Sequence, residues 1–522
     1  MTHLDGSYWV YGYDSMGQVT SGRKYWSDGT PVAGQQFDYA FDDIGNRQTT
    51  TRDGRQATYT PNTLNQYTNR TVPGFVNVLG TATNTATVSL WSQDNLALYT
   101  PTTRQGDYFR GEMLFNNNTG ALWLTITNVA VLSNHSGADI VTNIAGNLLL
   151  AKNPEAFTYD ADGNLTSDGL WTNVWNGENR RITVESRNTL PAAAKVKEAW
   201  TILADGRWIE RIVSTNNGTS YYPSQTNRYV WDNQVLLAVL DHTNGVVMSF
   251  LRGLDLSGSI QGAGGVGGVL AVQVGPAGPA GLAGTTHFTC YDGNGNVTAL
   301  VNAATGEESA RYAYGPFAEP LQRTGPMAKL NPIRFSTQYH DDYTEDDKYL
   351  FRDLRDGRWP NRDPLGELGF ETLRDRSPNP LGDDPNLYAF VGNNPIGNTD
   401  FLGLAHNWYN RGRCCNRSKE DQWALVDNGE GCARWRKLAP KKCVGGMWTD
   451  EDCEGMTCNG GFYKVAGYDL SAYCIFRCDI WPMGGRRWTP DPGDRGGRAT
   501  SPTGVGKCAD ESDYPPGYEY GR

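Results

Sequence analysis

Apolar and polar residues alternate in short runs along most of the first 330 residues, and glycine, asparagine or aspartate lies between one run and the next. Residues 87–91 (TVSLW) and 295–301 (GNVTALV) are two such runs, and residues 229–240 form a longer one. Runs of this kind, rich in β-branched and aromatic residues, are typical of β-strands. Because no segment sustains a period of 3.6 residues, the pattern predicts an all-β fold with little helix.

A short motif marks four of the boundaries between runs. It consists of an aromatic residue, aspartate, two variable residues and glycine, and its copies begin at Tyr13, Phe41, Tyr159 and Tyr291. Aspartate and asparagine side chains can cap a tight turn, and glycine readily adopts the positive φ that the turn needs. The motif therefore predicts hairpins that each bury one face by pairing with the next, so that they stack into a spiral or a curved β-shell.

Composition and charge argue against several classes of function. Glycine reaches 62 of 522 residues, and 27 Tyr and 16 Trp residues supply aromatic side chains for a turn-rich β core. The 57 acidic residues outnumber the 46 basic ones, and the net charge of −11 argues against nucleic-acid binding through the scaffold. The longest uncharged stretch, residues 256–291, is interrupted by glycines and prolines, so no membrane span is expected. A G-x-G-x-x-G match at 262–267 lacks the βαβ context of a nucleotide site, and no cofactor is expected.

Residues 331–404 carry a different set of motifs. In order along the chain these are GRW at 357–359, RDPLG at 362–366, NLYAF at 386–390, NNP at 393–395 and DFLGL at 400–404. Together they resemble the Rhs repeat-associated core of the Rhs, or YD-repeat, family. The aromatic–Asp–x–x–Gly turns extend the resemblance more loosely over the residues that precede this core.

The resemblance implies a hollow β-shell, similar to those of teneurins and toxin-complex proteins, that the core plugs at one end. It also implies a variable C-terminal module, which in bacterial members is often a toxin that an aspartyl autoprotease in the core cuts from the shell. We therefore expect a YD-repeat β scaffold over 1–330, the core plug over 331–404, and a small, cysteine-rich, irregular domain over 405–522.

Transferred residue by residue, the resemblance makes Asp363 and Asp400 the two catalytic carboxylates. The cleaved bond would join Leu404 to Ala405. Two carboxylates that lie close together do not both ionise easily, so one can hold a proton and act as an acid while the other activates water.

Three features depart from the family pattern. Phe401 stands where the family usually has proline, and an insert at 368–385 lengthens the separation of the two aspartates. The helper arginine expected thirteen positions before Asp363 falls on Leu350, and Arg352 could replace it only at a shifted register. The alternative interpretation is that Asp363 and Asp400 are turn residues of a non-catalytic plug.

The tail is rich in cysteine. Of ten cysteines only Cys290 precedes residue 405, and the others are Cys414, Cys415, Cys432, Cys443, Cys453, Cys458, Cys474, Cys478 and Cys508. This density predicts a disulfide framework and hence an oxidising compartment. A zinc site is the rival, but the tail has no C-x2-C pair and a single histidine, His406, so no metal is expected. Without further histidines or an H-x-E motif, a catalytic tail is also disfavoured.

Two functions remain open. The first is an Rhs-repeat scaffold that encloses or presents a variable C-terminal effector or recognition module, released by self-cleavage after Leu404. The second is a non-catalytic structural or adhesive cell-surface protein with a disulfide-bonded binding tail. Expected partners are the chain's own C-terminal module, cell-surface or carbohydrate ligands and, through the resemblance, an immunity protein. An extracellular or cell-surface location is expected, although residues 1–13 lack the basic and apolar segments of a signal peptide.

Overall fold

The computed structural model describes residues 2–3, 5–92, 98–364, 386–400 and 402–403, and it describes the backbone of the strands between residues 413 and 520. Two compact units make up the chain. Unit 1 comprises Met1–Gly253 and Gly264–His406, and unit 2 comprises Leu254–Ala263 and Asn407–Arg522. The described part has an all-β fold, as predicted, and its helical segments are short 3₁₀ turns.

The first sheet of unit 1 has seven strands in the order β1-β2-β3-β4-β5-β6-β14. Neighbouring strands pair antiparallel, mostly as consecutive hairpins. The strands are β1 (Tyr8–Tyr13), β2 (Val19–Tyr25), β3 (Pro31–Phe41), β4 (Arg47–Arg52), β5 (Arg55–Pro61), β6 (Tyr67–Arg70) and β14 (Glu155–Ala156).

The second sheet has fourteen strands in strict sequence order, β15 to β28, all antiparallel. A 3₁₀ turn, η1 (Ala192–Ala194), precedes β19. The strands are β15 (Thr158–Tyr159), β16 (Leu165–Ser167), β17 (Trp171–Trp175), β18 (Arg181–Ser186), β19 (Val196–Ile202), β20 (Trp208–Asn216), β21 (Tyr221–Asp232), β22 (Val235–Leu240), β23 (Val246–Arg252), β24 (Val269–Val274), β25 (Thr286–Tyr291), β26 (Val297–Asn302), β27 (Glu308–Tyr314) and β28 (Pro320–Thr324).

The two sheets form one wall. β14 ends at Ala156 and β15 begins at Thr158, so a single residue, Phe157, separates them. The Phe157 amide donates a hydrogen bond of 3.0 Å to the carbonyl of Thr68, in β6 of the first sheet. The wall therefore continues from β1 to β28 with only a local break in its ladder.

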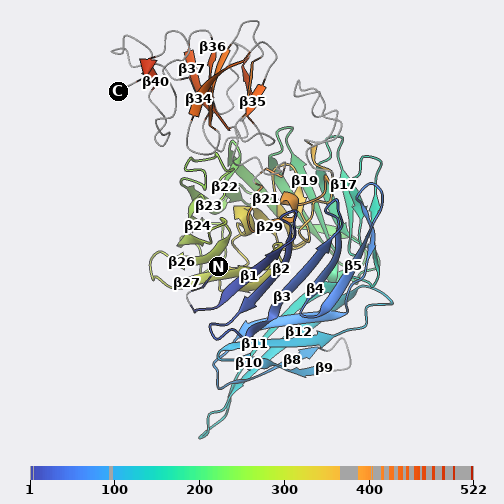
Figure 1. Ribbon diagram of the computed structural model, residues 1–522. Coiled ribbons are helices and arrows are strands. Elements are labelled where there is room, and N and C mark those ends of the chain that lie inside the picture. Colours follow the sequence, from blue (N-terminus) through green and yellow to red (C-terminus); the bar gives the residue numbers. More distant parts are fainter. Residues whose placement is uncertain are drawn as a thin grey trace. The chain divides into compact units, whose positions relative to one another are not determined.

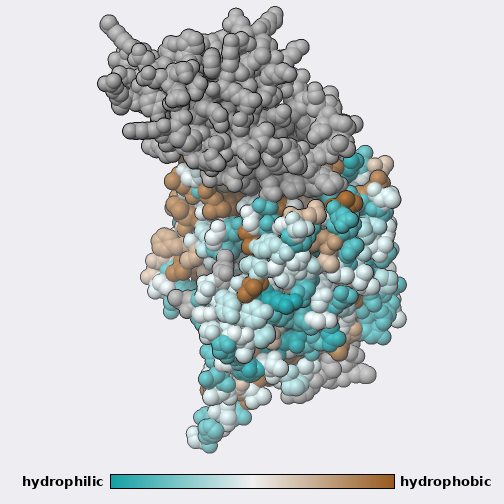
Figure 2. All heavy atoms as spheres, in the orientation of Figure 1, coloured by the Kyte–Doolittle hydropathy of each residue, from teal (hydrophilic) through white to brown (hydrophobic). Residues whose placement is uncertain are grey.

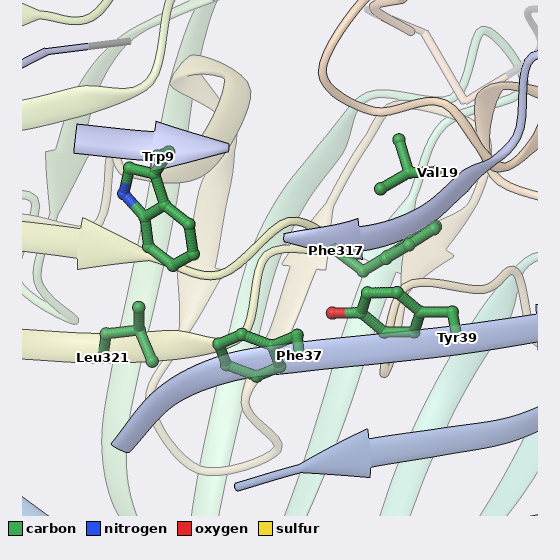
Figure 3. Packing of buried hydrophobic residues seen from close by; sticks show 6 residues of the cluster. All are labelled: Trp9, Val19, Phe37, Tyr39, Phe317 and Leu321. Atoms are coloured by element: carbon green, nitrogen blue, oxygen red, sulfur yellow. The ribbon is translucent and has the colours of Figure 1, made fainter. Parts of the chain in front are cut away.

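The first and last strands of this wall pack together. Trp9 of β1 and Phe37 of β3 share a buried cluster with Leu321 of β28 and with Phe317, just before β28 (Figure 3). The Tyr39 hydroxyl also donates a hydrogen bond of 2.7 Å to Glu319. Side-chain packing thus brings the two ends of the wall against each other, although no strand ladder joins them.

The repeated motif forms the turns that the sequence predicts. In the copy between β3 and β4, the Asp42 carboxylate accepts hydrogen bonds from the amides of Ile44 and Asn46 and from the Asn46 side chain. Gly45 has φ of +78°, where a side chain would be strained. The other copies place their glycines at similar positive φ.

A lobe is inserted between β6 and β14. It consists of a three-stranded sheet, β10-β11-β7, and a four-stranded sheet, β13-β12-β8-β9 (Figure 1). The two sheets share a core that includes Leu90, Met113 and Leu124. The strands are β7 (Phe75–Thr81), β8 (Thr87–Ser92), β9 (Leu98–Pro101), β10 (Thr103–Gln105), β11 (Tyr108–Leu114), β12 (Leu122–Leu132) and β13 (Ile140–Leu150). The long β12–β13 hairpin projects from it, with both Ile140 and Val141 exposed.

The region predicted as a plug, which we call the core block (residues 331–364 and 386–403), is mostly irregular. Its elements are η2 (Phe335–Thr337), β29 (Tyr339–Asp341), β30 (Asp346–Lys348), β31 (Asp353–Leu354) and η4 (Val391–Asn393). Six apolar side chains form its centre: Phe335, Tyr349, Leu354, Trp359, Phe390 and Val391.

Unit 2 contains the turns of Leu254–Ala263, and between residues 413 and 520 it is described only as backbone strands. Two sheets, β35-β32-β38 and β34-β33-β36-β37-β39, and one pair, β40-β41, are present. The strands are β32 (Arg413–Asn416), β33 (Gln422–Asp427), β34 (Ala433–Leu438), β35 (Cys443–Gly445), β36 (Asp452–Cys458), β37 (Gly461–Val465), β38 (Tyr473–Phe476), β39 (Gly485–Arg487), β40 (Arg498–Ala499) and β41 (Glu519–Tyr520). The side chains of the tail cysteines lie outside the described residues, so their predicted disulfides stay a prediction.

The surface of unit 1 is mixed in character. Figure 2 shows apolar side chains gathered over β23 to β26, where Leu251, Leu270 and Phe288 are exposed. Within the described residues, no helix has the length and apolar character needed to cross a membrane.

Candidate functional site

The core block is hydrogen-bonded to the turns of the first sheet. The Asn393 side-chain amide donates to the Gly45 carbonyl (2.8 Å) and to Gln18 Oε1 (2.9 Å). The Asn386 amide donates to Asn46 Oδ1 (3.0 Å), and all of these side chains are buried. The same turn residues that shape the hairpins therefore also hold the block.

The turns of the second sheet bind the block in the same way. The Tyr388 hydroxyl donates to the Gly163 carbonyl (2.8 Å), and the Thr337 hydroxyl donates to the Gly295 carbonyl (2.7 Å). A Cβ added to Gly163 would come within 2.6 Å of the Tyr388 hydroxyl oxygen. Glycine is thus required there both by its φ of +87° and by the closeness of the block.

Buried ion pairs form a second set of links between the wall and the block. Arg181 of β18 contacts Asp346 (2.6 Å) and Asp353 (2.9 Å) of the block. Arg355 also contacts Asp346 (2.7 Å), and it pairs with Asp168 of the wall (2.6 Å). Burial alone would raise the pKa of Asp346, but Arg355 and Arg181 outweigh it and hold that pKa well below its usual value.

A carboxylate pair shares one arginine nearby. Arg211 of β20 contacts Glu198 of β19 and Asp341 of the block, and all three are buried. Burial and the neighbouring Asp341 raise the pKa of Glu198 to about 8, with Arg211 opposing them. Glu198 therefore carries a proton at neutral pH while Asp341 is ionised.

The predicted catalytic carboxylates meet at Arg352. Its Nη2 atom lies 2.7 Å from Asp363 Oδ2 and 3.6 Å from Asp400 Oδ2. Its Nε donates to the carbonyl of Gly403, and its guanidinium lies 4.1 Å from the centre of the Trp359 ring. One buried arginine thus joins both carboxylates to the backbone that leads to Leu404.

The two carboxylates have different surroundings. The Asp363 side chain is 15% exposed, whereas Asp400 is fully buried. Asp400 Oδ1 accepts hydrogen bonds from the amides of Leu402 (3.1 Å) and Gly403 (2.8 Å). Asp363 is therefore the carboxylate that can reach water, and Asp400 fixes the turn before the predicted cleavage position.

The remaining predicted positions fall in different places. Leu350 lies two residues before Arg352 and lines a small cavity, and its apolar side chain cannot form an ion pair with either carboxylate. Phe401, Leu404 and Ala405, as well as residues 365–385 with the insert, lie outside the described residues. The last described residue before the expected cleavage position is therefore Gly403.

The arrangement suits hydrolysis of a bond in the chain itself. Two carboxylates share Arg352, which also holds the Gly403 carbonyl, and the Phe351 amide holds the preceding carbonyl, that of Leu402, at 2.9 Å. Such contacts fix a backbone segment in one geometry relative to the reacting groups. No separate substrate would be needed.

Sequence reasoning missed two positioning groups. Trp359 lies under the Arg352 guanidinium, and the Leu387 carbonyl accepts from both the Asp363 amide (3.0 Å) and Arg352 Nη1 (3.3 Å). Trp359 and Leu387 both occur in the motifs that carry the family resemblance, which was the available signal. Their contacts form only when the block folds, so no spacing between residues in the sequence predicts them.

Comparisons with known proteins give partial matches. No family model matches the chain. The tRNA nuclease WapA of Bacillus subtilis (strain 168) is 28% identical over 259 residues, and the tRNA3(Ser)-specific nuclease WapA of Bacillus spizizenii is 26% identical over 257 residues. Each match covers 49% of this chain and 9% of the relative, so the chain spans less than a tenth of the length of these relatives.

Solved structures with some similarity are toxin-complex assemblies. A crystal structure of TcdB2-TccC3 aligns with 77% of this chain and 19% of its own, at 15% identity and a TM-score of 0.36. A pore structure of the Photorhabdus luminescens Tc holotoxin aligns with 77% of this chain and 18% of its own, at 14% identity and a TM-score of 0.37. The chain thus has sequence similarity to part of the WapA nucleases and a distant likeness to part of these Tc toxin structures.

Proposed function

We propose that the chain is an Rhs/YD-repeat β scaffold that presents or encloses residues 405–522 as a C-terminal effector module and frees them by cutting itself after Leu404. In this proposal residues 1–330 form the shell and 331–404 the plug. The observation that carries the self-cleavage is the contact of Arg352 with Asp363, Asp400 and the Gly403 carbonyl.

The hydrolysis assigns a different role to each carboxylate. Asp363, which can reach water, removes a proton from it, and the water oxygen bonds to the carbonyl carbon of Leu404. The bond from that carbon to the Ala405 nitrogen breaks, and the leaving amine takes a proton from Asp400. Arg352 holds the Gly403 carbonyl and limits the repulsion between the two carboxyl groups.

Two further observations support the scaffold and the module. The wall's first and last strands pack together, and the core block is hydrogen-bonded to turns of both sheets, as a shell with a plug requires. The matched relatives are named as tRNA nucleases, which supports a toxin-like effector. A toxin-like module would act outside the producing cell, from an extracellular or cell-surface location, and would need an immunity protein within that cell.

Intact mass measurement of the purified full chain tests self-cleavage. We expect a fragment that ends at Leu404, in place of the 57.4 kDa chain. Asp363→Asn and Asp400→Asn should each abolish the fragment, because neither amide can exchange the required proton. Arg352→Lys should greatly slow its formation, since lysine cannot contact both carboxylates and a carbonyl with a planar group.

Glu345→Gln is the matched control. Glu345 is a half-exposed carboxylate of the same block, and its nearest charged partners lie 3.7 and 3.9 Å away. This variant should cut as the wild type does. An intact wild-type chain, or equal cutting in the Asp363→Asn variant, would refute the proposed mechanism.

The non-catalytic scaffold with a binding tail is the second candidate. It is favoured by the bonding of Asp400, whose Oδ1 caps the turn at 402–403 while its Oδ2 lies near Arg352. Such bonding is also what a purely structural aspartate would make. A stable 57.4 kDa chain whose Asp400→Asn variant loses stability would support this candidate.

A further inference from the structure

A small cavity lies between the wall and the core block, inside unit 1. Trp175, Ile202, Gly206 and Trp208 line it from β17 and from the hairpin of β19 and β20. Residues 348–353 of the block line it from the other side. A Cβ added to Gly206 would lie 2.9 Å from the Leu350 carbonyl oxygen, so the hairpin is in close contact with the block here.

The charged lining is mainly positive. Arg180, Arg181, Lys348 and Arg352 line the cavity, whereas Asp353 is its one acidic lining residue among those described. Asp353 is shared between Arg181 (2.9 Å) and Lys348 (2.8 Å). Arg181 and Arg352 also pair with Asp346, Asp363 and Asp400 outside the lining, so the preference for an anion comes from the N–H donors of the lining and not from an excess of positive charge.

Two buried N–H groups of the lining lack an acceptor. Arg181 Nε and Trp208 Nε1 have no hydrogen-bond partner, and these side chains are only 4% and 3% exposed. The Trp208 carbonyl accepts a hydrogen bond from Trp231 Nε1, so this neighbouring indole is satisfied. A buried donor without an acceptor costs roughly 1–3 kcal/mol, and a cavity species that accepts hydrogen bonds would remove that cost.

The size of the cavity limits what can bind. Its volume is about 20 Å³, which is enough for one water-sized species and too little for a phosphate ester, a sugar or a peptide side chain. We propose that the cavity is a binding site for a single small inorganic anion of the halide class, held by Arg181 and Trp208.

Such an anion would join the wall to the segment that carries Arg352. Arg181 and Trp208 belong to β18 and β20, whereas Lys348 and Arg352 belong to the block. The bound anion would therefore stabilise the docked block. This inference goes beyond the proposed self-cleavage, because the anion would bind whether or not the chain is cut.

Thermal unfolding of the wild-type chain, monitored separately from cleavage, gives the first test. Sodium chloride or bromide replaces sodium gluconate at constant ionic strength, so that only the anion changes. We expect the unfolding midpoint to rise by about 2 °C or more at 100 mM halide and to saturate. Sulfate at the same ionic strength should give no saturable rise, because it is too large for the cavity.

Crystals grown with bromide give a direct test. Anomalous scattering should place one bromide between Arg181 Nε and Trp208 Nε1. A water at that position without anomalous signal, together with equal midpoints in halide and gluconate, would overturn the proposal.

A pair of tryptophan variants separates binding from packing. Trp208→Phe removes one of the two unsatisfied donors described above, whereas Trp231→Phe removes an indole of the same aromatic cluster that does not line the cavity. Both variants should lose stability, but only Trp208→Phe should lose the halide dependence. Equal halide dependence in both variants would exclude Trp208 from the site and contradict the proposal.

Discussion

Glu198 is a buried carboxyl group that keeps its proton through neutral pH in the folded chain, because burial and Asp341 raise its pKa to about 8. In the unfolded chain a glutamate releases its proton near pH 4.3. Between these values the folded state binds more protons than the unfolded state, so stability falls as the pH rises. The pair formed by Glu198 and Asp341 thus weakens the docking of the block as the pH rises from about 4 to about 8.

Glu198→Gln should remove this pH dependence. Glutamine has nearly the shape of the protonated carboxyl and can still accept from Arg211 and donate to Asp341. We expect the variant to be more stable than the wild type at pH 8, by several kcal/mol, and about equal to it near pH 4. Urea unfolding between pH 4 and pH 9 measures the difference.

The control for this change is Glu185→Gln. Glu185 of β18 is partly exposed and pairs with Lys197 at 2.9 Å. Its substitution should leave the slope of stability against pH unchanged. If Glu198→Gln has the same slope as the wild type, Glu198 does not hold the proton.

At this scale the motifs predicted the candidate carboxylates but not the set of groups around them. Asp363 and Asp400 follow from the family resemblance, and the structure places both beside Arg352. The family spacing pointed to Leu350, because a two-residue change of register in an irregular segment leaves no trace in composition or periodicity. The links from Asn386 and Asn393 to distant turns could not be predicted, since they depend on how the whole wall curves.

Among the elements, the hairpin turns were the most predictable and the inserted lobe the least. The four motif copies form turns with glycine at positive φ. Two related turns escaped notice because asparagine replaces aspartate at Asn62 and Asn176 and replaces glycine at the positive-φ positions Asn65 and Asn179. The lobe was missed because its strands have the same apolar alternation as the wall.

The run at 229–240 is also not a single strand, which would be its simplest interpretation. It consists of the end of β21 and all of β22, joined by a tight turn. Asn233 takes a φ of +48° at that turn. Asparagine tolerates this conformation, so the three polar residues 232–234 are enough to divide the run into two strands.

Shortening the β12–β13 hairpin tests whether its tip contributes to the stability of the lobe. Ala130 and Thr142 are directly opposite, so Asn-Gly can replace residues 131–141 as a two-residue turn. Ile140 and Val141 are 58% and 59% exposed, and their removal should change the free energy of unfolding by less than about 1 kcal/mol. Self-association should decrease, since the shorter β13 leaves less uncharged edge.

Urea unfolding and sedimentation velocity measure these two effects. Leu90→Ala in the neighbouring strand β8 is the contrast, because Leu90 is fully buried and its truncation should cost about 2–5 kcal/mol. A deletion as costly as Leu90→Ala would show that the hairpin tip contributes to the lobe's core.

Across the whole molecule, stability depends on the contacts between wall and block. Asn46 and Asn386 are 340 residues apart in sequence and joined by a hydrogen bond of 3.0 Å. A double-mutant cycle with alanine at both positions should give a coupling energy of about 0.5–3 kcal/mol. Denaturant unfolding of the four chains measures it.

Asn117 serves as the reference for that cycle. Its side chain binds the carbonyls of Val72 and Ala151 at the base of the lobe, and it shares no partner with Asn46. The double variant of Asn46 and Asn117 should be additive within about 0.5 kcal/mol. If the changes in unfolding free energy at Asn46 and Asn386 were also additive, the block would not be held through the turn that contains Asn46.

The bonds from the block to the glycine turns have a consequence for the order of events during synthesis. Tyr388, Asn393 and Thr337 need carbonyls of Gly163, Gly45 and Gly295, which leave the ribosome at widely separated times. A scaffold lacking any of these turns would leave a buried donor unsatisfied and the block loosely seated. The block can therefore dock fully only after all three turns have formed. Under the proposed function, Arg352 and its two carboxylates then reach their cleaving arrangement only once the shell is complete.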